Sequence, residues 1–160
     1  MTTVAIITGN SNSGKYCIEE LFTRYKDSGL KIKAGFRSAE KAQPLLDKYP
    51  GLEAVTDVDA YKPESMVKLF QGSKYALIVT PHDMSKGFSD DAKLTSNMIN
   101  TAVEQGVNYI VLVASFTVNN MERMGMIGSR FKPSEDLLEK LGKEKNIKWT
   151  VLRGGCFMVN

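Results

Sequence analysis

Three short aliphatic runs constrain the fold of this chain more than any other feature of its sequence. They occupy residues 4–7, 76–79 and 110–113, and each is apolar at every position. A strand with one wet face would instead alternate apolar and polar residues. Continuous aliphatic and β-branched runs are typical of strands that are covered on both faces, as in a parallel sheet. The sequence therefore predicts parallel strands with helices on both sides.

The stretches between the apolar runs have helical periodicity. Gly29, Gly72 and Gly106 each follow such a stretch, where a left-handed cap favours glycine. Strict alternation of strand and helix predicts one doubly wound α/β domain over residues 1–160. We predict strands over 3–8, 31–36, 53–56, 75–80, 108–114 and 149–153, and helices over 14–27, 38–48, 63–70, 88–105 and 133–145.

Composition narrows the classes of partner. The net charge is +3 and the lysines are dispersed, so we expect no nucleic acid partner. The 2 cysteines, Cys17 and Cys156, have no CxxC spacing and there is 1 histidine, which argues against a metal site; we expect Cys17 to lie in the core. No apolar run approaches the ~18 residues of a membrane span, and no signal-peptide pattern is present. We therefore expect no membrane association and a cytoplasmic location.

The turn after the first predicted strand has the composition of a phosphate-binding loop. Ligands of doubly wound sheets bind at the carboxyl ends of the strands. Glycine allows the backbone to approach a ligand closely, and the N–H groups of a helix N-terminus attract phosphate. The alternative is a simple strand-to-helix turn. We predict that the cofactor-binding residues of this turn are Gly9, Asn10, Ser11, Asn12, Ser13 and Gly14.

The same turn is one position short of a P-loop. Gly9, Gly14 and Lys15 match that pattern, but Tyr16 stands where a Ser or Thr must hold magnesium. A nucleotide triphosphatase is therefore disfavoured.

The end of the second predicted strand bears on the choice of cofactor. NAD-preferring folds carry Asp or Glu at this point, but this chain carries Arg37, with Lys41 one helical turn later. Arginine can form paired hydrogen bonds with a 2′-phosphate. We predict that Arg37 and Lys41 select NADP(H); for Arg37 the alternative is a solvated surface residue.

Further segments carry a family resemblance: residues 35–42, 57–59, 80–81, 106–111, Ser115 and 149–160. With the glycine loop, they make the sequence similar to the NmrA-like branch of the extended short-chain dehydrogenases. That branch includes NADP(H)-dependent quinone and dye reductases and NADP-sensing regulators. The resemblance implies a Rossmann fold and adds four expected cofactor-binding residues: Asp59, Thr80, Pro81 and Ser115. An Asx-turn or helix-cap role is an equal alternative for Asp59.

Three departures from the family pattern stand out. The glycine loop is one residue shorter and has Asn12 near the missing middle glycine. Gly154 replaces the usual proline. Family members also carry a further segment that builds most of the substrate pocket, and the sequence does not contain it. We therefore expect a cofactor domain, either a fragment or a stand-alone unit, from which the small substrate domain is absent.

The usual proton donor of short-chain dehydrogenases is missing. None of the 6 tyrosines stands four residues before a lysine, so the Tyr-xxx-Lys pair is absent. His82, after the fourth predicted strand, is a candidate to position a substrate or supply a proton. Lys132 resembles a family lysine that reaches the nicotinamide ribose. A structural or solvated role is the alternative for both residues.

These features favour two functions. The first is hydride transfer from NADPH to a quinone-like or other conjugated acceptor, which needs little proton donation from the protein because the cofactor supplies the chemistry. The second is a non-catalytic NADP(H) sensor that binds a regulated protein. Either is compatible with an oligomer. A P-loop protein is the third, disfavoured alternative.

Overall fold

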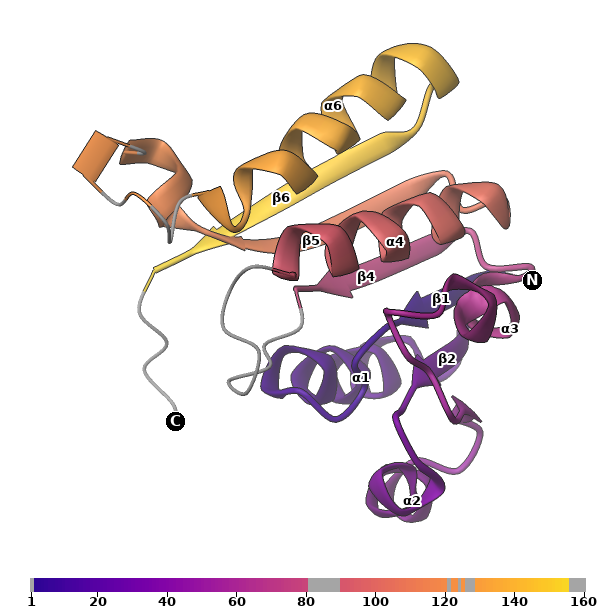
Figure 1. The fold of residues 1–160 in the computed structure, drawn as a ribbon. Coiled ribbons are helices and arrows are strands. Elements are labelled where there is room, and N and C mark those ends of the chain that lie inside the picture. Colours follow the sequence, from indigo (N-terminus) through magenta and orange to yellow (C-terminus); the bar gives the residue numbers. More distant parts are fainter. Residues whose placement is uncertain (1, 81–89, 121, 124, 126–128, 156–160) are drawn as a thin grey trace.

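The computed structural model describes the chain except for residues 1, 81–89, 121, 124, 126–128 and 156–160. Six parallel strands form one sheet in the order β3-β2-β1-β4-β5-β6 (Figure 1). The order changes direction between β1 and β4, as in a doubly wound Rossmann fold, which confirms the predicted fold class. The strands are β1 (Thr3–Ile6), β2 (Lys31–Gly35), β3 (Glu53–Val55), β4 (Tyr75–Val79), β5 (Tyr109–Ser115) and β6 (Lys148–Gly154).

Helices pack on both faces of the sheet. The first face carries α1 (Asn12–Tyr25) and α2 (Ala39–Lys48). The second face carries η1 (Pro63–Met66), α3 (Val67–Phe70), α4 (Asp91–Glu104) and α6 (Lys132–Lys145). A short 3-10 helix, η2 (Phe116–Asn120), follows β5.

Each face of the sheet has its own hydrophobic core, because successive strand residues point to opposite sides. On β5, Ile110 and Leu112 are fully buried against the α4 and α6 side. Val111 and Val113 point to the α1 side and are partly buried. The second-face core is therefore continuous under β4, β5 and β6, whereas the first-face core becomes less buried along the same strands.

The predicted elements agree with the structure except at several boundaries. The first helix begins at Asn12, two residues early, because the Ser11 side chain caps it. The helix ends at Tyr25, two residues earlier than predicted, and the Tyr25 side chain is 52% exposed. The predicted helix 63–70 is divided into a 3-10 turn and α3, and η2 was not predicted. Short 3-10 segments have no apolar period of their own, which is why sequence patterns miss them.

Two ion pairs join the segments after β4 and β5 to the rest of the fold. The guanidinium of Arg153 on β6 donates to both carboxylate oxygens of Glu135, at 3.1 and 2.5 Å, and to the Oδ1 atom of Asn119. The carboxylate of Asp91, at the start of α4, pairs with the Arg130 guanidinium, and their side chains are 2% and 14% exposed. Buried charges are tolerated when they are paired in this way.

Among the described residues, every helix is too short or too polar to cross a membrane.

The two-sided core predicts different costs for two leucines on neighbouring strands. Leu112→Ala removes a fully buried side chain and should lower the free energy of unfolding by about 2–5 kcal/mol. Leu152→Ala is the control, because Leu152 is 50% exposed; its cost should stay near ~0.5 kcal/mol. Urea unfolding measures both values. Equal costs would contradict the assignment of the two faces.

Candidate functional site

The turn from β1 into α1 is tightly hydrogen-bonded. The Ser11 N–H donates to the Thr8 carbonyl at 2.9 Å, and the Ser11 hydroxyl accepts from the Gly14 N–H at 3.0 Å. Thr8 has a φ of 60°, a left-handed conformation that is rare for a β-branched residue. Strained backbone of this kind is concentrated at functional sites.

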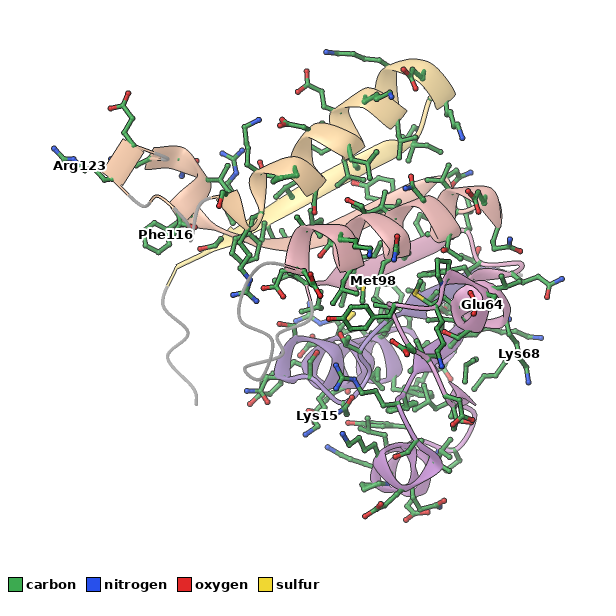
Figure 2. The ribbon with its side chains drawn as sticks, in the orientation of Figure 1. Lys15, Glu64, Lys68, Met98, Phe116 and Arg123 are labelled. Atoms are coloured by element: carbon green, nitrogen blue, oxygen red, sulfur yellow. The ribbon has the colours of Figure 1, made fainter. Side chains whose placement is uncertain are left out.

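The start of α1 presents unpaired donors. The N–H groups of Asn12 and Ser13 are in the first turn of the helix and donate to no acceptor among the described residues. Free N–H groups at a helix N-terminus, together with the positive end of the helix dipole, form an anion site. Lys15, in the same turn, is exposed (Figure 2). The arrangement fits the pyrophosphate of a dinucleotide.

The two glycines of the turn have intramolecular roles. A Cβ atom on Gly14 would lie 2.5 Å from the Thr8 carbonyl oxygen, so α1 can approach the end of β1 only with glycine at this position. A Cβ atom on Gly9 would lie 2.9 Å from the Phe36 ring. Glycine at these positions was predicted to let a ligand approach the backbone. In the structure, neighbouring atoms of the chain itself also leave no room for a side chain at Gly9 or Gly14. Their contact with phosphate stays a prediction.

A groove runs along the carboxyl edge of the sheet from this turn. At one end it is bounded by Phe36, Val58, Ala60 and Met98. Toward the other end it passes Asn10, Ser11, Arg37, Lys41 and Thr80, and this part has a volume of about 340 Å³. The structure therefore brings five of the predicted cofactor-binding residues to one surface: Asn10, Ser11, Arg37, Lys41 and Thr80.

Two cations flank the N-terminus of α2. Arg37 and Lys41 are exposed, and neither forms an ion pair with a described carboxylate. Ser38 caps α2 with extended backbone but accepts no hydrogen bond through its side chain. Cations near a helix N-terminus are unfavourable unless an anion is bound there, and Glu40 offsets part of this charge. These two side chains line the groove and are the residues that could hold a second anionic group.

Asp59 forms the Asx turn that was one of its two predicted roles. Its Oδ1 atom accepts the Tyr61 N–H at 2.9 Å, and the Ser65 hydroxyl bonds its backbone N–H and carbonyl. The neighbouring Tyr61 hydroxyl donates to Asp90 at the start of α4. Asp59 therefore holds the loop after β3, and contact with adenine stays a prediction.

The remaining predicted residues are at or near the carboxyl edge. The Thr80 hydroxyl is 3.2 Å from that of the buried Thr95, and the Ser115 hydroxyl accepts the Thr117 N–H. Lys132, the first residue of α6, pairs with Asp136 on its own helix. Pro81 and His82 lie outside the described residues.

Sequence reasoning missed Thr8 and the apolar wall formed by Ala60 and Met98. Ala60 and Met98 reach the groove through the packing of the β3 loop and α4, which are distant in sequence from the turn after β1. No local pattern marks such a residue. Within the described part of the chain, no cluster of His, Cys, Asp or Glu is suited to a metal ion.

Comparison with known proteins shows which family this chain belongs to. The model of the NAD(P)H-binding family matches residues 9–159, so the chain belongs to that family. This confirms the family expected from the glycine loop and the C-terminal motif. An uncharacterised chloroplastic protein of Arabidopsis thaliana is 26% identical over 95% of this chain and 58% of its own length.

Solved structures share the fold. Triphenylmethane reductase of Citrobacter sp., complexed with NADP(H), is 21% identical with a TM-score of 0.82, over 99% of this chain and 50% of that protein. The NADPH-dependent quinone oxidoreductase QOR2 of Escherichia coli, complexed with NADPH, is 24% identical with a TM-score of 0.80, over 96% of this chain and 49% of that protein. The chain thus spans about half the length of these relatives.

The packing of Gly14 yields a prediction that does not depend on any ligand. Gly14→Ala should lower the free energy of unfolding by about 1–3 kcal/mol, because the added methyl group overlaps the Thr8 carbonyl. Gly155→Ala is the matched control, since a Cβ atom there meets nothing within 4 Å. Thermal unfolding without cofactor compares the two. Equal melting temperatures would show that α1 can move away from the strand.

Proposed function

We propose that this groove binds NADP(H), and that the protein uses it to reduce a quinone-like or other conjugated acceptor. The observation that supports the choice of cofactor most strongly is the pair Arg37 and Lys41. Both line the groove, and neither pairs with a carboxylate in the part of the chain that the structure describes. The pyrophosphate is assigned to the N-terminus of α1. The adenine is assigned to the end bounded by Phe36, Val58 and Met98.

Electrostatics favours NADP(H), which carries a 2′-phosphate, over NAD(H). A 2′-phosphate beside Arg37 would form charge-assisted hydrogen bonds, each worth roughly 1.5–3 kcal/mol. A ribose hydroxyl would leave both cations without an anion. No carboxylate ends β2, so the usual acceptor for the 2′-hydroxyl of NAD is missing. The relatives complexed with NADP(H) and NADPH support the same choice.

The bound cofactor would supply the hydride. The residues of this chain bind and orient it: the α1 N–H groups hold the phosphates, and the buried Thr95 positions the Thr80 hydroxyl at the end of β4. Since no Tyr-xxx-Lys pair is present, solvent protonates the reduced acceptor. Lys132 would have to leave Asp136 to reach a ribose, and His82 remains the candidate for a substrate-side role.

An NADP(H) sensor is the second proposal, supported by the missing tyrosine donor. Its partner would be a regulated protein instead of a small substrate. The P-loop alternative finds little support, because the side chain that should hold magnesium is the 56% exposed Tyr16. The cytoplasmic location stays a prediction, and the Arabidopsis relative is described as chloroplastic.

Cofactor preference tests the role of Arg37. Arg37→Asp should weaken NADPH binding by about tenfold to a hundredfold, through a lost charge-assisted contact and added repulsion, and leave NADH binding nearly unchanged. Isothermal titration calorimetry measures both affinities.

Lys26→Asp is the matched control for that variant. It makes the same charge change at the opposite end of α1 and should leave both affinities as they are. An unchanged ratio of the NADPH and NADH affinities in Arg37→Asp would refute the assignment of Arg37.

The P-loop alternative is tested by thermal unfolding with added nucleotide. Mg²⁺ with ATP should give no thermal shift, whereas NADPH should raise the melting temperature by mass action.

Turnover with quinones tests the proposed chemistry. Tyr→Phe changes at Tyr16, Tyr61, Tyr75 and Tyr109 should each leave the rate within about tenfold, well short of the ~10²–10⁴ contributed by a positioned general acid. His82→Ala is the informative comparison: a large loss of rate with intact NADPH binding would support a substrate-side role. A large loss from one tyrosine variant, with cofactor affinity intact, would refute solvent protonation. No NADPH oxidation with any quinone would favour the sensor.

A further inference from the structure

Polar residues mark the point at which each of the strands β4, β5 and β6 begins. Lys74 and Asn108 directly precede Tyr75 and Tyr109, the first residues of β4 and β5. Lys148 is the first residue of β6. Because parallel strands begin at the same edge of a sheet, these residues gather at the amino edge, opposite the cofactor groove (Figure 1). No cofactor assignment uses them.

A cavity of about 450 Å³ lies at this edge, a volume within the range of small-molecule sites. Its lining comes from the starts of the three strands and the end of α6: Lys74, Tyr75, Asn108, Tyr109, Asn146 and Lys148. Backbone hydrogen bonds fix its rim. The Lys148 N–H donates to the Asn108 carbonyl at 2.9 Å, and the Asn108 N–H donates to the Lys74 carbonyl at 3.2 Å. The cavity is therefore preformed, which lowers the cost of binding a ligand.

Two tyrosines form an aromatic wall of this cavity. The register pairs Tyr75 with Tyr109 and Tyr109 with Lys148, so the three side chains project from the same face of the sheet. The two ring centroids are 5.9 Å apart with planes at 55°, and the Tyr109 and Thr150 hydroxyls bond each other at 2.8 Å. Such a pair can stack on a flat ligand with one ring and meet its edge with the other. Because the row ends in an exposed lysine, it suits a polar occupant better than an apolar cover.

Two ammonium groups line the cavity without a counter-ion. Lys74 and Lys148 are exposed, and neither pairs with a carboxylate among the residues that the structure describes. The Lys74 Nζ atom lies 5.5 Å from the centroid of the Tyr75 ring, beside the aromatic wall. Like charges at one cavity repel each other, and a bound anion would relieve that repulsion.

The side-chain amides of Asn108 and Asn146 add donors to the same cavity. Within the described part of the chain, neither amide forms a side-chain hydrogen bond. An amide nitrogen can donate two hydrogen bonds, so both residues can contribute to holding an anion.

We propose that this cavity binds a small aromatic anion, with its ring against Tyr75 and Tyr109 and its charged group between Lys74 and Lys148. The site lies at the edge of the sheet opposite the cofactor groove. The proposal therefore does not depend on the proposed function.

Other classes of ligand match fewer of the lining groups. The two ammonium groups would repel a cation, and a neutral apolar molecule would leave both without an anion. Inorganic phosphate would pair with the lysines but would leave the tyrosine rings unused. An aromatic anion uses the charges, the amides and the rings together.

Binding of 2-naphthoate, measured by equilibrium dialysis, tests which groups the cavity recognises. The amide 2-naphthamide keeps the rings and lacks the charge, and it should bind about tenfold more weakly. Decahydro-2-naphthoate keeps the charge and lacks the aromatic faces, and it should bind about threefold more weakly. No binding of 2-naphthoate, or equal binding by either matched molecule, would overturn the proposal.

Substitutions locate the bound molecule. Lys74→Gln and Lys148→Gln should each weaken 2-naphthoate binding about tenfold, because each removes one charge-assisted contact. Lys31→Gln is the matched control, since Lys31 is the exposed first residue of β2 at the same edge and lies outside the lining of the cavity. It should leave the affinity unchanged, and so should added NADPH. Affinities in the two cavity variants equal to that of Lys31→Gln, or displacement of 2-naphthoate by NADPH, would show that the molecule binds elsewhere and would refute the site.

Discussion

The position of α1 depends on one close contact, between Gly14 and the carbonyl oxygen of Thr8. With any Cβ at position 14 the two atoms would be 2.5 Å apart, so the helix would have to move away from the strand. The same contact aims the Asn12 and Ser13 N–H groups over the carboxyl edge. One approach of helix to strand thus fixes where these two N–H groups lie.

Local sequence determines much of this fold, and tertiary packing determines the rest. The three aliphatic runs correctly predicted β1, β4 and β5, because a strand that is covered on both faces is apolar at every position. The Ser11 cap and the capping glycines are equally local. Met98 and Ala60 could not be assigned to the groove, since they reach it through the packing of α4 and the β3 loop. For Asp59, the sequence left two roles open, and the hydrogen bond from the Tyr61 N–H to its side chain shows that it forms the Asx turn.

The groove has the N-terminus of α1 and the pair Arg37 and Lys41 on its borders, and an apolar wall at one end. Backbone N–H groups at α1 can hold phosphates of any dinucleotide, so they carry affinity without discrimination. In the proposed assignment, Arg37 and Lys41 respond to one additional phosphate and therefore carry selectivity. Under this assignment, a substitution at Arg37 or Lys41 would change cofactor preference without disturbing the phosphate contacts of α1.

The buried pair of Asp91 and Arg130 affects how the stability of this region changes with temperature. The pair joins the start of α4 to the segment that precedes α6, and both side chains are largely removed from water. The desolvation penalty of charged groups decreases as temperature rises, whereas hydrophobic stabilisation per unit area reaches a plateau. The link between these two segments therefore strengthens, relative to the apolar cores around it, as the protein is warmed.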